Sequence, residues 1–493
     1  MSASETKTVI KARQEQLSKA VSVVTRAFGS KIRRTGVQVD EVSLLSPIVY
    51  VTTSVGLLTS LADHDEVVRI YSAESIDGDD MDVAAGAIRA DDIWNSGFNG
   101  SGVTVAIVEG GRVDFDNNCL GLNGGTRSTS DSTVSQHATA VAGMVASINT
   151  TIRGIASGAS IYSANGSDDY NSSKMTKALD AGATNAEILN NSWGAKTCKG
   201  ANSSMSAHAR QADYIVRYVW DTVVASSGNK GNCTDGGFVG GSGVKAGHNV
   251  ITVGNYNDKG TTDWDDDTMS SSSSYKNPSS DFGDREKPDV AAPGTSISSL
   301  LLASPGTCPT GNVGNGTSYS SPMVAGTAAL LLEADYALSV YPETVKALIM
   351  AGARNNIEGS ARLSDRDGAG GIDAYESYCS LFLNRYRWFD VTSRSFDSNG
   401  DINVDMGYVQ AGRRVKVALV WLSNPSSDYK DDVLEADLDL YVVGPNSEHV
   451  SCSFDNSAEV VDFTATKSGN YKIKINNWRF DGVSEYVAVA WSY

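Results

Sequence analysis

The sequence has 493 residues, which is enough for two or three domains at a usual size of roughly 150 residues each. Hydrophobic residues make up 41% and charged residues 20% of the chain. These are ordinary values for a globular protein, and no stretch approaches the run of about 18 apolar residues that a membrane-spanning helix needs. With 40 basic and 58 acidic residues the formal net charge is -18, which repels phosphate backbones and anionic lipid heads. We therefore expect neither nucleic acid nor a membrane as a partner.

The six cysteines are widely spaced and form no C-x-x-C pair, which argues against a zinc site. Disulfides and buried free thiols are both compatible with this spacing. The cysteines are Cys119, Cys198, Cys233, Cys308, Cys379 and Cys452. Cys198 and Cys233 each follow a motif described below, so these two are candidates for close neighbours. The first residues lack the pattern of a secretory signal, so either the chain stays inside the cell or a signal precedes this sequence, and localisation stays open.

Residues 1–80 predict a small α/β domain. Its expected elements are, in chain order, a helix over 6–28, strands over 37–45 and 47–53, a short helix over 55–64 and a strand over 65–71. The long helix is predicted from apolar residues at helical spacing, and the strands from short apolar runs. An acid-rich linker over 72–83, extending to about residue 87, separates this domain from the next one, as polar segments commonly do at domain boundaries.

The chain over 88–380 alternates strand-like apolar runs with helix-like segments. This alternation predicts parallel strands joined by helical crossovers, with a ligand site where the carboxyl ends of the strands meet the loops. Over 385–493 the pattern changes to short alternating strands separated by turns rich in Gly, Asn, Asp and Ser. The sequence therefore predicts an α/β domain followed by a C-terminal β-sandwich.

The strongest local signal is a Gly-Thr-Ser turn that opens into an apolar helix within residues 314–332. Pro322 falls in the first turn of this helix, where its missing N–H costs nothing. Ser318 then lies at the positive end of the helix, where the dipole and backbone N–H groups favour the oxyanion that forms when a serine attacks a carbonyl. Without partners, the simpler interpretation is a serine that only caps the helix.

Candidate partners of this serine stand at the ends of other elements. A serine hydroxyl is too weakly acidic to attack unaided, so a histidine must take its proton and a carboxylate must hold the imidazole. His137 begins a strongly apolar helical segment, a position that suits a general base. Glu109 ends the strand-like run "VTVAIVE" and can supply the carboxylate. Asn229 follows another strand in a Ser-Gly-Asn sequence, where its amide can donate to an oxyanion, although this sequence is also simply a good turn.

Together these motifs resemble those of the subtilisin-like serine peptidases. "GTSYSSP" matches the family's Gly-Thr-Ser-x-x-x-Pro motif, "HATAVAG" matches its histidine motif, and the order acid, histidine, serine agrees. The resemblance spans nearly all of residues 88–378 and implies Ser318 as nucleophile, His137 as base and Asn229 as oxyanion donor. It also implies a subtilisin-like parallel-sheet catalytic domain, an N-terminal domain similar to the inhibitory propeptides and a C-terminal jelly-roll-like β-sandwich.

The resemblance further implies the segments that bind substrate. The residues expected there are Ser192, Trp193, Gly194, Ser227 and Gly228. Trp193 offers an aromatic surface for the substrate residue before the cleaved bond, and a core or surface tryptophan is the alternative interpretation.

Two positions depart from the family pattern. The usual aspartate is replaced by Glu109, and the second histidine of the histidine motif by Ala140. Glutamate keeps the charge but lengthens the reach by one methylene, and we expect Gly110 and Gly111 to leave room for the adjustment. The related sedolisins use a glutamate with their serine, but they lack a histidine in this role. We therefore predict a Glu-His-Ser triad that works near neutral pH.

Asp114 and Asp116 are rival candidates for the acid. They lie five and seven residues beyond Glu109, in the loop expected after the strand, so Glu109 is preferred.

The sequence thus predicts a serine endopeptidase that acts on protein or peptide substrates through an acyl-enzyme on Ser318. A pseudoprotease or partner-binding scaffold would keep the fold without the reaction, and a peptide ligase or cyclase would pass the same acyl group to an amine. The chemistry requires no cofactor. Structural calcium is a further candidate, with Asp437, Asp439 and the acidic loop over 261–274 as ligands, although solvated acidic residues are the simpler interpretation. The oligomeric state and the removal of residues 1–80 are not predicted.

Overall fold

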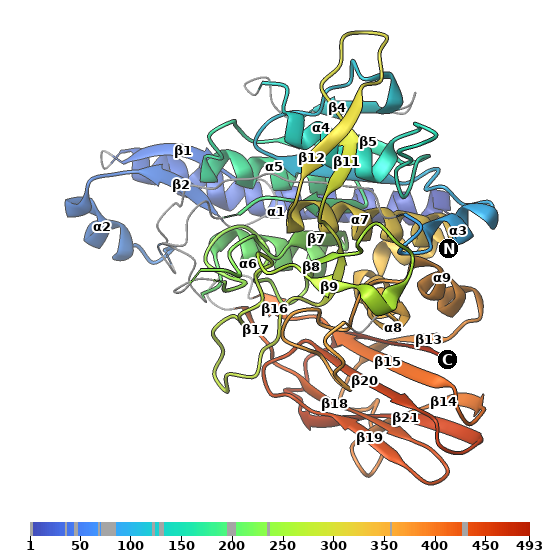
Figure 1. Ribbon diagram of the computed structural model, residues 1–493. Helices are drawn as coiled ribbons and strands as arrows, with labels where there is room; N and C mark the ends of the chain where they lie inside the picture. Colours follow the sequence, from blue (N-terminus) through green and yellow to red (C-terminus); the bar gives the residue numbers. More distant parts are fainter. Residues whose placement is uncertain are drawn as a thin grey trace.

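The computed structural model describes residues 3–34, 37–43, 48–67, 70, 85–120, 124–127, 133–194, 204–233, 237–354, 357–425 and 432–493. Three parts follow one another along the chain: a small N-terminal unit, a central α/β domain and a C-terminal β-sandwich (Figure 1). None of the described helices is both long enough and apolar enough to cross a membrane. The predicted fold class is confirmed.

The central sheet has the strand order β10-β8-β7-β6-β3-β5-β4, and all of these neighbours pair in parallel. Its strands are β3 (Thr104–Glu109), β4 (Gly124–Arg127), β5 (Ser160–Asn165), β6 (Ile188–Asn191), β7 (Thr222–Ser226), β8 (Ile251–Asn257) and β10 (Val290–Pro293), with β9 (Thr268–Met269) antiparallel to β8. Because β3 lies between β5 and β6, Glu109 is paired with Asn165, and Val108 with Asn191. Polar residues therefore meet where these three strands end.

Helices cover both faces of this sheet because successive residues of each strand point to opposite faces. The covering helices are α4 (Gln136–Ala146), α5 (Ser172–Asn185), α6 (Ala207–Tyr214) and α7 (Thr317–Ala334). Val105 and Ile107 of β3 pack in one core with residues of α4 and α7. Ala106 and Val108 pack in a second core with residues of α5 and α6. The buried strand β3 thus holds its last residue, Glu109, between two helical layers.

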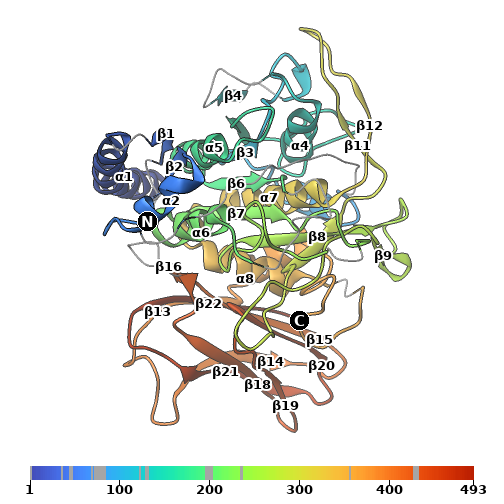
Figure 2. The same cartoon turned by 90° about the vertical axis from the view of Figure 1, so that its left-hand side faces the viewer.

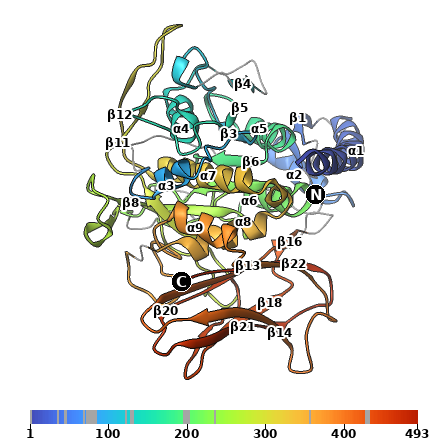
Figure 3. The same cartoon turned by 90° about the vertical axis from the view of Figure 1, so that its right-hand side faces the viewer.

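The other elements of the central domain surround this framework. They are α3 (Ala90–Asn95), α8 (Pro342–Gly352), α9 (Ala374–Phe382), the π-helix η2 (Ile215–Val219), the 3-10 helices η1 (Asn118–Leu120), η3 (Trp264–Asp266) and η4 (Tyr336–Val340), and the antiparallel strands β11 (Ile297–Leu300) and β12 (Thr310–Gly314). Figure 3 shows α8 and α9 between the central sheet and the sandwich, and both helices contact the sandwich strand β22.

The N-terminal unit consists of α1 (Ala3–Arg33), the antiparallel strands β1 (Gln38–Val42) and β2 (Val49–Thr52), and α2 (Val55–Ala62). It lies beside α5 and α6 (Figure 2). The Ser43 hydroxyl donates to the Asp180 carboxylate of α5 at 2.6 Å, and Arg13 Nε donates to the carbonyl oxygen of Tyr218 at 2.9 Å. The strand expected over 65–71 is not seen in its described part, where residues 65 and 66 form a turn. Residues 68, 69 and 71 of that segment and the linker over 72–83 lie outside the described residues.

The C-terminal sandwich consists of two four-stranded antiparallel sheets, ordered β13-β22-β15-β20 and β14-β21-β18-β19. Its strands are β13 (Tyr386–Val391), β14 (Asp401–Val409), β15 (Arg414–Trp421), β18 (Asp437–Val443), β19 (Glu448–Ser451), β20 (Ala458–Thr464), β21 (Gly469–Arg479) and β22 (Glu485–Ser492), with the short pair β16 (Asn424–Pro425) and β17 (Asp432–Val433). Val417 and Leu419 of one sheet share a core with Leu440 and Ile475 of the other, because alternate residues of each strand face inward.

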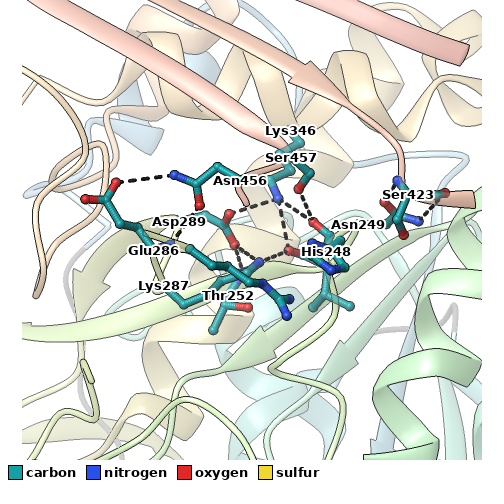
Figure 4. Close-up of polar contacts among 12 residues, drawn as sticks. His248, Asn249, Thr252, Glu286, Lys287, Asp289, Lys346, Ser423, Asn456 and Ser457 are labelled. Carbon is teal, nitrogen blue, oxygen red and sulfur yellow. Dashed lines mark hydrogen bonds and ion pairs between the residues drawn. The ribbon is translucent and has the colours of Figure 1, made fainter. Parts of the chain in front are cut away.

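A buried polar network joins the central domain to the sandwich (Figure 4). Asp289, just before β10, contacts the ammonium groups of Lys287 at 2.6 Å and of Lys346 in α8 at 2.8 Å. Lys346 also donates to the carbonyl oxygen of His248 at 3.1 Å. From the sandwich, the Ser457 hydroxyl donates to the same carbonyl oxygen at 2.8 Å. Both domains therefore hold the segment that precedes β8.

Replacing Asp289 tests how far the fold depends on this network. Burial would raise the pKa of the Asp289 carboxyl, but Lys287 and Lys346 outweigh burial and hold that pKa below its usual value. Asp289→Asn leaves two buried ammonium groups without their counter-charge. We expect the free energy of unfolding, measured by urea denaturation, to fall by about 3–5 kcal/mol. Asp405→Asn, at an exposed position of β14, is the control, and an equal loss in both variants would contradict this role of Asp289.

Candidate active site

The predicted acid, base and nucleophile stand at the ends of buried elements. Glu109 is the last residue of β3, and His137 and Ser318 are each the second residue of a helix, α4 and α7. Helix α4 begins at this point because the Ser135 side chain caps it, accepting from the N–H of Ala138 at 3.2 Å. The acid, the base and the nucleophile are each no more than 3% exposed.

The Glu109 carboxylate reaches the His137 imidazole. Its Oε2 atom lies 3.3 Å from Nδ1 of His137, within the distance of an ion pair. The same oxygen accepts a hydrogen bond from the Tyr170 hydroxyl at 3.2 Å. A carboxylate removed from water needs such partners, because burial penalises its charge. The longer side chain of glutamate is thus accommodated without losing the histidine.

The two glycines after Glu109 do not leave open space, in contrast to the expectation from the sequence. A Cβ atom on Gly110 would lie 2.7 Å from the Tyr170 ring, and one on Gly111 would overlap Ser135. Tyr170 has a φ of 51°, in the left-handed region, which costs a bulky residue roughly 1–3 kcal/mol. The glycines therefore permit the close approach of the tyrosine that contacts Glu109 and of the serine that caps the histidine helix.

The rival acid Asp114 has other partners. Asp114 accepts from the backbone N–H of Ala303 at 2.8 Å and from that of Asp116 at 3.1 Å. These bonds tie the loop after β3 to the chain beyond β11. The Asp114 carboxylate is therefore occupied within the loop, whereas Glu109 contacts the imidazole.

The histidine and serine helices pack against each other. The His137 ring lies against the ring of Tyr319, the residue after Ser318, with 5.3 Å between ring centroids. Ser192, which follows β6, donates its hydroxyl to the carbonyl oxygen of Ser318 at 2.5 Å. The fold thus gathers the carboxylate, the imidazole and the serine near the carboxyl ends of β3 and β6.

Asn229 is attached to the N-terminus of the serine helix. Its side-chain oxygen accepts from the backbone N–H of Thr317 at 2.9 Å and from the Thr317 hydroxyl at 3.0 Å. A backbone N–H can only donate, so the atom that faces Thr317 is the amide oxygen, and Nδ2 is the donor that points elsewhere. The Gly228 N–H donates to the same hydroxyl at 3.0 Å and fixes the turn.

Comparison with known proteins agrees with this geometry. Residues 97–370, more than half of the chain, match the model of the peptidase S8 or subtilase family. This chain belongs to the subtilase family.

The relatives of this subtilase align over only part of their own length. Subtilisin E of Bacillus subtilis is 29% identical over 258 residues, which cover 50% of this chain and 59% of that protein. Serine protease AprX of the same organism is 35% identical over 188 residues, which cover 34% of this chain and 38% of that protein. Among solved structures, a serine protease of Aeromonas sobria is 15% identical, with a TM-score of 0.46 and coverage of 84% of this chain and 93% of that chain.

The predicted substrate-binding residues of this subtilase occupy two adjacent segments. Ser192, Trp193 and Gly194 follow β6, while Ser227 and Gly228 follow β7, and these two strands are paired. The Trp193 side chain is only 3% exposed, and its indole N–H donates to the side-chain oxygen of Asn191 at 3.1 Å. Its burial fits a core tryptophan, the alternative interpretation, rather than an aromatic surface for substrate.

The calcium candidates Asp437 and Asp439 lie two residues apart on β18 and therefore on one face. Among the described residues, neither carboxylate oxygen of Asp437 has a hydrogen-bond partner, and burial raises the pKa of this carboxyl to about 6. Asp439 accepts from the Tyr441 hydroxyl at 3.4 Å. No group of three or more His, Cys, Asp or Glu side chains in the described part of the chain is placed to hold a metal. Two carboxylates alone are too few for calcium, so structural calcium, in this strand or in the loop over 261–274, stays a prediction.

Both disulfide-bonded and free cysteines occur among the described residues. Cys119 and Cys308 form a disulfide between the loop after β3 and the hairpin of β11 and β12. Cys233 is also disulfide-bonded, and Cys198 lies outside the described residues. The thiols of Cys379 and Cys452 are free.

His208 of α6 connects the segment after β6 to the N-terminal unit. Its ring meets that of Trp193 edge to face at 5.1 Å between centroids, and its Nε2 atom lies 3.1 Å from the Tyr50 hydroxyl of β2. The same nitrogen lies 3.0 Å from the carbonyl oxygen of Ser172. Burial lowers the pKa of His208 to about 4, so the imidazole is neutral at neutral pH.

The pH dependence of stability tests this burial. The unfolded chain binds a proton at His208 near pH 6.5, and the folded chain does so only near pH 4. Stability is therefore lost as the pH falls from 6.5 towards 4, by about 2 kcal/mol at pH 5 relative to pH 8. Urea denaturation of the full chain at both pH values measures the loss. His208→Gln lacks this titration and should lose correspondingly less stability, whereas identical pH dependence in both proteins would contradict the prediction.

Proposed function

We propose that this subtilase is a serine endopeptidase that uses Glu109, His137 and Ser318 as a Glu-His-Ser triad. The observation that carries the proposal is the buried contact of 3.3 Å between Glu109 Oε2 and His137 Nδ1, beside the helix that presents Ser318. Charge, burial and position together suit Glu109 to the role that an aspartate usually takes. No cofactor takes part in this scheme, and the substrate is a protein or peptide.

In the first step of the proposed reaction, His137 Nε2 accepts the proton of the Ser318 hydroxyl while Oγ forms a bond to the peptide carbonyl carbon. Glu109 accepts from the Nδ1–H of His137 and stabilises the imidazolium. Asn229 Nδ2 and the Ser318 N–H donate to the oxyanion. His137 then gives the proton to the leaving amine as the C–N bond breaks. Water, deprotonated by the same imidazole, attacks the acyl group and restores Ser318 with release of the acid.

Tyr170 has a positioning role in this scheme. It donates to the Glu109 oxygen that contacts His137, and it is held there in a costly backbone conformation. Both partners of this oxygen restrict the rotation of the glutamate side chain. The carboxylate is thereby kept within reach of the imidazole.

Labelling by a fluorophosphonate tests the nucleophile. The probe should form a covalent adduct with the wild type and none with Ser318→Ala, because only an activated serine reacts with it. Mass spectrometry of the labelled peptide identifies the site. Absence of labelling on the mature wild-type protein would contradict the proposed function.

Intact masses of the two proteins also show whether the same serine removes the N-terminal unit. In that case a species shortened by roughly the first 70–90 residues should be present in the wild type and absent from Ser318→Ala.

Substitution of the acid tests the triad. Glu109→Gln keeps the shape but cannot stabilise the imidazolium, so the labelling rate should fall by about 10³–10⁴-fold, the scale on which a triad carboxylate acts in other serine peptidases. Glu109→Asp keeps the charge and should retain most of the rate. Tyr170→Phe loses one hydrogen bond and should slow labelling by no more than about tenfold. Equal rates for the wild type and Glu109→Gln would show that Glu109 does not orient His137.

A further inference from the structure

Lys245 places an ammonium group between the two segments that flank Ser318. The residue lies in the chain between β7 and β8 and is only 5% exposed. A Cβ atom built on Gly194 would lie 3.0 Å from Lys245 Nζ, and one built on Gly228 would lie 3.0 Å from the same atom. One ammonium group therefore borders both segments, and it does so at a glycine of each.

These two segments also border the candidate nucleophile. Ser192 donates to the carbonyl oxygen of Ser318, and the Gly228 N–H donates to Thr317, the residue before Ser318. The resemblance to the subtilisin-like peptidases implies that the side chain of the substrate residue before the cleaved bond lies between these segments. Lys245 Nζ lies beside Gly194 of one segment and Gly228 of the other.

The two glycines differ in how strongly their positions favour glycine. Gly228 has a φ of 106°, so its backbone conformation alone favours glycine. Gly194 does not have a positive φ of this kind, so its backbone would accept alanine. The methyl group of an alanine would lie 3.0 Å from the ammonium group, which would have to move by a few tenths of an ångström. Glycine at position 194 therefore leaves the ammonium group where it lies.

The backbone around Lys245 is held firmly. The Lys245 carbonyl oxygen accepts from the Thr252 hydroxyl at 2.8 Å, and the next carbonyl, that of Ala246, accepts from the Arg285 guanidinium. Three residues after Lys245, the carbonyl of His248 is part of the interdomain network in Figure 4. The fold therefore fixes the backbone from which the lysine side chain extends.

We propose that Lys245 makes this subtilase prefer substrates with Glu or Asp immediately before the cleaved bond. The inference rests on the proposed function, because it names the substrate class of the same site. A carboxylate that meets an ammonium group forms a short, charge-assisted hydrogen bond, about twice as strong as one between neutral groups, and salt screens buried charges little. A lysine or arginine of the substrate meets like charge at this place, and a large apolar side chain offers no acceptor.

The test uses peptides that differ only in the residue before the cleaved bond, which is Glu, Gln, Asp, Asn, Ala or Lys. Glu and Gln have nearly the same shape, so the ratio of their kcat/KM values isolates the effect of charge. We expect this ratio to be about tenfold or more in the wild type and near one in Lys245→Met, which keeps an unbranched side chain of similar length. Lys472→Met removes one positive charge at an exposed position of the distant strand β21 and should leave the ratio unchanged.

A Glu-to-Gln ratio near one in the wild type, or one that Lys245→Met leaves unchanged, would overturn the inference. A preference for Ala over both acids would do so as well, because the lysine would then simply fill the pocket. Fluorophosphonate labelling in the same buffer distinguishes the two proposals. An unlabelled wild type rejects the peptidase function, whereas a labelled wild type without acid preference, or without cleavage of the acidic peptides, rejects only the role of Lys245. Labelling of Lys245→Met shows that this variant is folded.

Discussion

The contact between the Glu109 carboxylate and the His137 imidazole is buried, so the surrounding chain has to supply hydrogen-bond donors to the carboxylate. A carboxylate out of water is stable only if donors surround it, and these donors have to come from elements that are distant in the sequence. Tyr170 supplies one of them and lies 61 residues from Glu109. Gly110 and Gly111 follow the acid directly because any side chain there would displace the tyrosine or the cap of the histidine helix.

The parallel sheet brings together the residues around the contact between Glu109 and His137. Parallel strands end at one edge of the sheet, so Glu109 on β3, Ser192 after β6 and Gly228 after β7 lie near one another. The helix that begins with Thr317 and Ser318 packs over the same strands. Thr317 bonds Gly228 and Asn229 after β7, and Ser192 after β6 donates to the carbonyl oxygen of Ser318. The candidate nucleophile is thus held from two neighbouring strand ends.

The β-sandwich is part of the same structural unit. Ser457 of the sandwich and Lys346 of α8 bond the carbonyl oxygen of His248, three residues after Lys245 (Figure 4). The buried ion pairs of Asp289 hold Lys346 in place. A domain that carries none of the proposed triad residues therefore bonds the segment that contains Lys245, the lysine that we propose to select substrates.

The sequence by itself determined the parallel sheet, the sandwich and the family, because strand and helix periodicities and the serine and histidine motifs are local patterns. It also indicated Glu109, since an acid at the end of a buried strand is unusual. Only the tertiary structure decided that Tyr170 contacts this acid, that Trp193 is buried in the core, and that Lys245 lies between two glycines. These facts depend on contacts between side chains that are far apart in the sequence, and a local sequence pattern does not predict such contacts.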